Sequence, residues 1–275
     1  MSHDDPIYLD CPGAHLAIAT LEASATRSTW LANITIQACM SYILVTGSSR
    51  GIGAAAHDAL AQRGVKVIGH ATRGGDEARI AADFRDPLAA QILWEEAMAR
   101  SGGDIVAVVN NAGLFEANRL DRSDIEWLDA WEDTLRINLT AAAQLSRFAV
   151  RHWQERGTGG RLVHVASRAA YRGDSPAHWH YAAAKGGMVA MHKSIARAYA
   201  KEGILSFAVT PGFTDTAMAG DYLESRGGAG LLADIPLGRV ATPDEIASII
   251  TFCALDAPPS MTGAVIDANG ASFVR

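Results

Sequence analysis

Tyr181 and Lys185 stand four residues apart in a segment with helical spacing. On a helix, this spacing puts both side chains on one face, about one turn apart. A free phenol loses its proton near pH ~10, which is too high for an acid or base at neutral pH. A lysine cation about 4 Å away, at an effective dielectric of ~20, stabilises a phenolate by roughly 4 kcal/mol, or about three pK units. We therefore predict that the pKa of Tyr181 lies near neutrality and that Tyr181 acts as a general acid or base. The alternative is a chance pair on an exposed helix face.

A glycine-rich segment at residues 46–53, which reads TGSSRGIG, could bind a dinucleotide. It follows a short apolar run and precedes an alanine-rich stretch. Glycine lets the backbone turn tightly and approach a diphosphate, and the start of a helix offers unpaired N–H groups at the positive end of its dipole. The spacing G-x-x-x-G-x-G differs from the G-x-G-x-x-G dinucleotide fingerprint. An ordinary strand-to-helix turn is therefore the alternative interpretation.

These residues need elements to position them, and from Met40 onward strand-like and helix-like segments alternate. Apolar runs typical of strands buried on both faces lie at residues 42–46, 65–69, 105–110, 161–166, 205–210 and 264–267. Segments with helical spacing lie at residues 54–62, 89–100, 131–156, 181–201 and 243–255. The alternation predicts an α/β fold, a doubly wound parallel sheet in a single domain of residues 40–275. Within it, residues 214–237 are expected to form the substrate loop.

Residues 1–39 differ from the rest and are expected to lie outside the folded core. Arg27 is their only lysine or arginine, and they contain four acidic residues, which is unlike a secretory signal or a transit peptide. The hypothesis is that Met40 begins the folded domain and is the natural translation start. The alternative is an extra helix around Leu16 to Trp30 that packs on the domain.

Composition excludes several classes of function. The 275 residues carry a net charge of −6, which argues against nucleic acid or an anionic membrane as a partner. No apolar run approaches the ~18 residues of a membrane helix. Three cysteines without CxxC spacing suggest neither a disulfide framework nor a zinc site, and a cytoplasmic location is expected. His178 and His180 lie in a predicted loop with no third ligand at a recognisable spacing, so no metal is predicted.

Three further motifs lie at distances that fit the same fold. The sequence NNAG at 110–113 directly follows the third apolar run, where a doubly wound sheet opens its ligand crevice. The sequences YAAAK at 181–185 and PGFTDT at 211–216 come later in the chain. With these motifs, the chain from Met40 to near Arg275 resembles the short-chain dehydrogenase/reductase family. The resemblance implies a Rossmann-type sheet and an oxidoreductase that interconverts a ketone and a secondary alcohol by hydride transfer.

The resemblance also implies catalytic roles. Tyr181 would protonate the carbonyl oxygen, Lys185 would bind the nicotinamide ribose, and Ser167 would hold the substrate oxygen by a hydrogen bond. Ser167 precedes Tyr181 by 14 positions, where many relatives have 13, and the extra residue is expected in the loop 174–179. Asn138 corresponds to a helix asparagine that supports a water path from the lysine to solvent. A satisfied core amide is the alternative role for Asn138.

The adenosine end of the predicted site favours NADP(H) over NAD(H). Residues 67–73 contain no acid that would accept the ribose 2′-OH of NAD, whereas Arg50 and Arg73 suit a 2′-phosphate. Both arginines could instead be solvated surface charges. The full set of predicted cofactor-binding residues is Gly47, Ser49, Arg50, Gly51, Ile52, Gly53, Arg73, Asp83, Phe84, Asn111, Ala112, Gly113, Tyr181, Lys185, Pro211, Gly212, Thr214 and Thr216.

The resemblance implies a small carbonyl or alcohol compound as substrate, and resemblance to 3-oxoacyl-thioester reductases makes a 3-oxoacyl thioester the leading hypothesis. A dehydrogenase of sugars, polyols or xenobiotic ketones is the alternative enzyme, and a catalytically silent cofactor-binding regulatory protein is the alternative of another class. Trp179 is expected to help wall the substrate pocket, and Arg168 and Arg172 could face an anionic substrate. Residues 131–156 and 181–201 resemble the family's long helices that pair between subunits, which predicts a homodimer or homotetramer.

Overall fold

A parallel sheet of seven strands lies at the centre of the molecule in the computed structural model, which describes residues 41–216 and 232–275. The strand order is β3-β2-β1-β4-β5-β6-β7, and every neighbouring pair is parallel. The order runs outward in both directions from β1 and β4, so the predicted doubly wound α/β fold is confirmed. The strands are β1 (Tyr42–Val45), β2 (Lys66–Ala71), β3 (Arg79–Ala81), β4 (Ile105–Asn110), β5 (Gly160–Val165), β6 (Ile204–Pro211) and β7 (Val265–Ala268).

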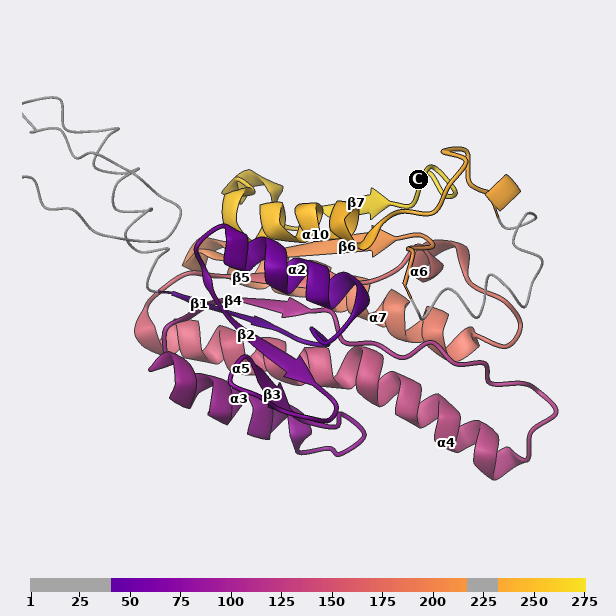
Figure 1. The fold of residues 1–275 in the computed structure, drawn as a ribbon, viewed down its shortest axis with the longest axis horizontal. Helices are drawn as coiled ribbons and strands as arrows, with labels where there is room; N and C mark the ends of the chain where they lie inside the picture. Colours follow the sequence, from indigo (N-terminus) through magenta and orange to yellow (C-terminus); the bar gives the residue numbers. More distant parts are fainter. Residues whose placement is uncertain (1–40, 217–231) are drawn as a thin grey trace, which may run out of the picture.

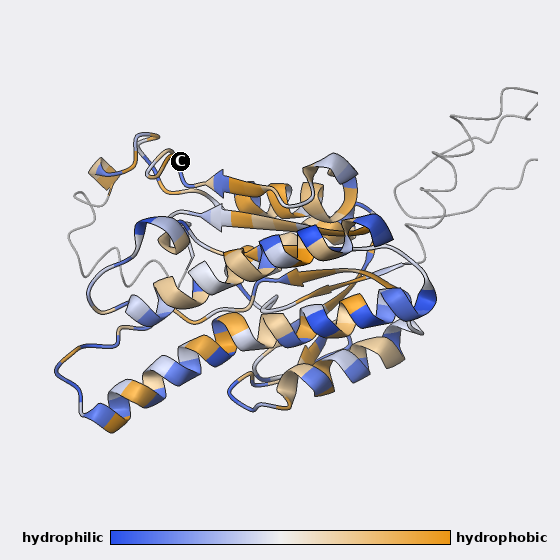
Figure 2. Ribbon diagram, turned by 180° about the vertical axis from the view of Figure 1, so that it is seen from behind, coloured by the Kyte–Doolittle hydropathy of each residue, from blue (hydrophilic) through white to orange (hydrophobic). Residues whose placement is uncertain are grey.

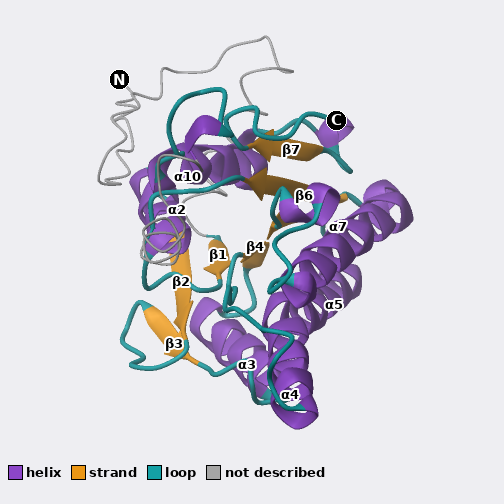
Figure 3. Ribbon diagram, turned by 90° about the vertical axis from the view of Figure 1, so that its right-hand side faces the viewer, coloured by secondary structure: helices purple, strands orange, loops and turns teal. Residues whose placement is uncertain are grey.

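Helices cover both faces of this sheet (Figures 1 and 3). Helices α2 and α10 pack on each other and on one face, while α3, α5 and α7 lie on the other. The α-helices are α2 (Gly51–Gln62), α3 (Ala89–Ser101), α4 (Asp124–Leu135), α5 (Ala141–Arg156), α6 (Ala169–Arg172), α7 (Trp179–Tyr199) and α10 (Pro243–Thr251). The π-helical turns η1 (Arg136–Thr140) and η3 (Phe252–Asp256) and the 3₁₀ turns η2 (Ala200–Glu202) and η4 (Pro259–Met261) extend or join them.

The core consists of two apolar layers, one on each face of the sheet. Leu60 and Ile250 pack with Val45 and Phe207 in one layer. Leu93, Leu145 and Trp153 pack with Leu44 and Val108 in the other. In Figure 2 the strands in the middle are mostly hydrophobic, and the helices around them carry both hydrophilic and hydrophobic residues. Because the central strands are buried from both sides, their sequences lack polar alternation.

Several element boundaries differ from the prediction. Strand β3 was not predicted, because three residues with one buried side chain, Ile80, give too short a pattern. The segment predicted as one helix over 131–156 is α4, η1 and α5, and it begins earlier, after a capping box formed by Ser123 and Glu126. Helix α7 begins at Trp179, so His180 is helical and the prediction of a loop there is wrong.

Parts of two predictions lie outside the described residues. These are the predicted extension 1–39 and the stretch 217–231 of the predicted substrate loop 214–237. Among the residues that are described, no helix combines the length and apolar character needed to cross a membrane.

Candidate active site

The glycine turn joins the end of β1 to the start of α2, at the edge of the sheet where the strand order reverses. Gly47 and Gly51 have φ values of 65° and 55°, a backbone region that residues with a side chain rarely adopt. A Cβ atom on Gly53 would overlap the carbonyl oxygen of Gly47 and the side-chain amide of Asn111. Position 53 is therefore packed too closely for any residue but glycine, and the turn lines the cavity described below.

Asn111, which follows β4, ties this turn to the neighbouring strand. Its side-chain Nδ2 donates to the carbonyl oxygens of Thr46 at 2.9 Å and Gly47 at 3.2 Å. The Thr46 hydroxyl accepts from the backbone N–H groups of Asn111 and Ala112 at 2.9 and 3.0 Å. Two motifs that are more than 60 residues apart in sequence are thus joined by four hydrogen bonds at the switch point of the sheet, where doubly wound folds bind ligands.

A cavity of about 620 Å³ opens over this junction. Arg50 and Arg73 lie at its exposed margin, and within residues 41–216 and 232–275 neither guanidinium makes a hydrogen bond or ion pair. This part of the cavity suits a dinucleotide diphosphate. It offers glycine backbone without side chains and the N–H groups at the start of α2. The predicted cofactor-binding residues that line this cavity are Gly47, Ser49, Arg50, Gly51, Ile52, Gly53, Arg73, Asp83, Phe84, Asn111, Ala112, Gly113 and Thr216.

Sequence reasoning missed several residues of this cavity. His70, at the end of β2, lines it and stacks on Phe84 with ring centroids 4.3 Å apart. Arg85 and Glu116 also line it, and Arg85 forms an ion pair with Asp133 at 2.9 Å. A histidine at the end of a predicted strand next to the glycine turn was the available signal for His70. Nothing local in the sequence distinguishes Arg85 or Glu116.

A smaller cavity of about 140 Å³ adjoins the first, because Ile52, Gly113 and Thr216 line both. Tyr181 and Lys185 reach it from α7, and Ser167 reaches it from the end of β5. Pro211, Gly212 and Thr214, predicted to contact the cofactor, lie on this second cavity and not on the first. The structure thus brings the predicted acid, lysine and serine together beside the predicted cofactor site.

The predicted effect of the lysine on the tyrosine is not found. Burial raises the pKa of Tyr181 to about 12, and a hydrogen bond with Ser167 only partly opposes this rise. Lys185 donates from Nζ to the carbonyl oxygen of Val165 at 2.7 Å, and its Nζ lies 5.8 Å from the centroid of the Tyr181 ring. Burial also lowers the pKa of Lys185 to about 8. Desolvation therefore outweighs the attraction between the pair, and Tyr181 is held in its protonated form.

Asn138 lies behind the lysine in the π-helical turn η1 and is fully buried. Its Oδ1 accepts from the backbone N–H of Leu114 at 2.7 Å, and its Nδ2 donates to the Leu114 carbonyl at 2.8 Å. A Cβ atom on Gly113 would come within 3.0 Å of Oδ1 and 3.6 Å of the Lys185 ammonium. Asn138 lines neither cavity. Both polar atoms of the Asn138 side chain are hydrogen-bonded, as in the core amide that the sequence analysis gave as the alternative. The side chain also lies close to Lys185.

The wall of the smaller cavity contains aromatic and charged side chains. Phe115 meets the Tyr181 ring edge to face at 4.8 Å, and the Arg168 guanidinium lies 4.6 Å over the Phe213 ring. Asp174 also lines this cavity. Trp179 and Arg172 are exposed and do not line the cavity, so the expected contribution of Trp179 to the wall is wrong.

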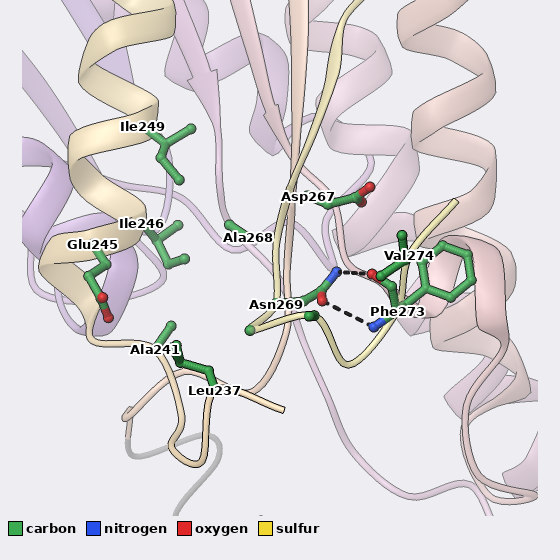
Figure 4. A pocket seen from close by; sticks show the side chains of 12 residues that line it. Leu237, Ala241, Glu245, Ile246, Ile249, Asp267, Ala268, Asn269, Phe273 and Val274 are labelled. Carbon is green, nitrogen blue, oxygen red and sulfur yellow. Dashed lines mark hydrogen bonds between the residues drawn. The ribbon is translucent and has the colours of Figure 1, made fainter. Parts of the chain in front are cut away.

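Another cavity, of about 360 Å³, lies between α10 and the end of β7. Figure 4 shows it, with Asn269 closing the C-terminal turn by two hydrogen bonds to the backbone of Phe273, each 3.1 Å long. None of the predicted catalytic or cofactor-binding residues lines this cavity. Across the described residues, no three histidine, cysteine or acidic side chains gather where they could hold a metal ion.

Comparisons with known proteins agree with this architecture. Residues 47–270 match the family model described as Enoyl-(Acyl carrier protein) reductase. The chain is 34% identical over 242 residues to the 3-oxoacyl-[acyl-carrier-protein] reductase FabG of Escherichia coli strain K12, covering 84% of this chain and 96% of that protein. The protein of the same name from Pseudomonas aeruginosa is 34% identical over 244 residues, with the same coverage.

Two solved structures are similar in fold and sequence. A candidate 2-deoxy-D-gluconate 3-dehydrogenase from Agrobacterium tumefaciens with bound NADP superposes with a TM-score of 0.75 at 27% identity. A candidate NAD(P)-dependent gluconate 5-dehydrogenase from Beutenbergia cavernae, with NADP bound at low occupancy, gives 0.76 at 28% identity. Each comparison covers 84% of this chain and 96% of the other.

Proposed function

Since the chain belongs to the short-chain dehydrogenase/reductase family, we propose that it reduces a 3-oxoacyl thioester with NADPH. The family and the named relatives make it an NAD(P)-dependent oxidoreductase that interconverts a ketone and a secondary alcohol, as predicted. The observation that carries the proposal is the convergence of Ser167, Tyr181 and Lys185 on a cavity that adjoins the nucleotide cavity. The thioester is supported by the names of the relatives at 34% identity.

In this proposal the chain's own residues handle the proton. When bound, the nicotinamide cofactor supplies the hydride that reaches the carbonyl carbon. Tyr181 donates its phenolic proton to the carbonyl oxygen, and its raised pKa keeps it protonated at neutral pH. Ser167 holds the same oxygen by a hydrogen bond. Lys185 stabilises the phenolate that forms, and Asn138 positions the neighbouring backbone of Leu114.

The proposed preference for NADPH rests on the two arginines at the margin of the nucleotide cavity. Arg50 and Arg73 can bind a 2′-phosphate, and β2 and the residues after it up to Arg73 include no acid to repel one. Replacing Arg73 by alanine is expected to raise the Kd of NADPH about 10-fold and leave the Kd of NADH unchanged. Arg151→Ala, on the exposed side of α5, is the control and is expected to change neither. Tighter binding of NADH than NADPH by the wild type would refute the preference.

A sugar-acid dehydrogenase is the second candidate. Arg168 and Asp174 line the cavity beside Ser167; the guanidinium suits a carboxylate and the Asp174 carboxylate can accept from hydroxyl groups, which fits a sugar acid better than an acyl chain. The two structures with bound NADP are named as dehydrogenases of gluconates, which supports this candidate independently.

The deciding experiment is NADPH consumption by the purified protein with a 3-oxoacyl thioester, run beside Tyr181→Phe. Turnover by the wild type and loss of most of the rate in the variant would support both the substrate class and the acid. No consumption with the thioester, followed by reduction of a keto-gluconate, would instead support the second candidate.

The proposal includes a homodimer or homotetramer in the cytoplasm. Its support is three exposed apolar side chains in and just before the first turns of α4, namely Leu120, Ile125 and Leu128, of which Ile125 is 74% exposed. Light scattering after gel filtration is expected to give a multiple of 29.1 kDa for the wild type and a smaller mass for Ile125→Asp.

The single cysteine in the described residues, Cys253, is a buried free thiol, which fits a reducing compartment. Cell fractionation tests that location.

A further inference from the structure

One buried side chain connects two segments that lie far apart in the sequence and border the nucleotide cavity. His70, at the end of β2, is 2% exposed and contacts the glycine turn, the residues after β3 and the ring of Phe84. The backbone N–H of Gly47 donates to Nδ1 at 3.0 Å, and Nε2 bonds the carbonyl oxygen of Ala82 at 2.8 Å. Both ring nitrogens and one ring face are therefore used to hold walls of the same cavity.

The two bonds define the form of the ring. A carbonyl can only accept a hydrogen bond, so Nε2 carries the proton, and an N–H can only donate, so Nδ1 must keep its lone pair. The ring is thus neutral. Burial lowers the pKa of His70, with Asp83 opposing this through its charge, and the neutral form is consistent with both contacts. Ser48 adds to the packing, because its Oγ accepts from the His70 backbone N–H at 3.1 Å.

We propose that His70 is a positioning residue for the dinucleotide, which sets the distance and orientation of the glycine turn relative to the segment Ala82–Phe84. This inference rests on the proposed use of a nicotinamide dinucleotide. The turn is placed to meet the diphosphate and the 82–84 segment to meet the adenine. Without the imidazole, the Gly47 N–H lacks its acceptor, and the two walls are linked indirectly, through the bonds that Ser48 and the Ala82 N–H make to β2. Binding would then have to order them, and that cost appears as weaker affinity.

The test is a titration of NADPH fluorescence with three variants of His70. His70→Phe keeps a ring beside Phe84 but removes both hydrogen bonds. His70→Asn places an acceptor near Nδ1 and can retain the bond to Gly47, whereas His70→Gln places its amide near Nε2 and can retain only the bond to Ala82. The control is His192→Phe, because His192 is equally buried, bonds Ser206 at 2.8 Å and lines neither cavity of the site.

We expect His70→Phe to raise the Kd and KM of NADPH about 10-fold or more, with kcat within about twofold of the wild type. His70→Asn is expected to bind more tightly than His70→Gln. If His70→Phe does not fold, the comparison of the Asn and Gln variants decides. Unchanged affinity in His70→Phe, equal affinities of the Asn and Gln variants, or an equal loss in His192→Phe would each overturn the inference.

The titration needs no carbonyl substrate, so a failed thioester assay does not affect it. If the wild type prefers NADH, the same comparison is made with NADH, because the diphosphate and adenine are common to both. Binding of neither nucleotide by the wild type would overturn this inference and the proposed function together.

Discussion

The rate of carbonyl reduction is expected to depend on the protonation of Lys185. At 5.8 Å from the Tyr181 ring and an effective dielectric of ~20, an ammonium stabilises a developing phenolate by roughly 3 kcal/mol, which is more than about 100-fold in rate. An enzyme with neutral Lys185 would therefore contribute little turnover, and the rate should follow the charged fraction of this side chain.

The direction follows from the lowered pKa. With a pKa of about 8, Lys185 is charged below pH 8 and loses its proton above it. The charged fraction is about 0.91 at pH 7 and about 0.09 at pH 9, so kcat/KM for reduction should fall about tenfold between them. Tyr181, with a pKa of about 12, stays protonated over this range and contributes no inflection.

The assay is kcat/KM for NADPH oxidation from pH 6 to 10, because this ratio reports groups of the free enzyme. Lys185→Arg keeps the charge throughout and should remove the fall near pH 8. Should that variant be inactive, ¹³C NMR of labelled lysine decides, since the chain has only four lysines. A flat wild-type profile from pH 7 to 9, or a Lys185 signal that titrates near 10, would refute the reasoning.

Further predictions concern single substitutions. Tyr181→Phe should lose most of the reduction rate while the Kd of NADPH stays within about twofold, because the phenol donates the proton and does not set nucleotide affinity. Stopped-flow kinetics measures the rate and a titration measures the Kd. Loss of both the rate and the affinity for NADPH would contradict this prediction. Gly53→Ala should abolish measurable NADPH binding, since its Cβ meets the backbone oxygen of Gly47, whereas Gly186→Ala, with only an ordinary contact, should bind normally. Trp153→Ala, at a site 1% exposed, should lower the free energy of unfolding by about 3–5 kcal/mol in urea, and a loss below about 1 kcal/mol would show that the core can collapse around it.

The sequence was most informative where function depends on local backbone geometry. The glycine-rich segment predicts a tight turn, and the Tyr181–Lys185 spacing predicts two side chains on one helix face. Both predictions need only a few consecutive residues, because a turn and a helix repeat are local. The strands were readable for a related reason, since burial on both faces leaves continuous apolar runs. Strand β3 could not be predicted, because it is too short to show such a run.

The sequence predicted which residues belong to the site better than it predicted their pKa values and contacts. The spacing placed Lys185 beside Tyr181 correctly, but the pKa of Tyr181 moves up, because burial of the phenol outweighs a lysine that bonds Val165. Asn138 could be named from its family motif, while its position in a π-helical turn depends on contacts with Leu114 that lie 24 residues away. Desolvation and such contacts are properties of the packed chain.

The sequence by itself therefore determined the alternation of elements, the glycine turn and the residue types that could carry out carbonyl reduction, because each is encoded in a short stretch. Only the tertiary structure decided that β1 and β4 are neighbours, that the cavity at their ends adjoins the one beside Tyr181, and that His70 joins the glycine turn to residues 82–84. The physical reason is that proximity, burial and hydrogen-bond partners arise between residues far apart in sequence, and the free energies that set a pKa or a binding site exist only once those residues have been brought together.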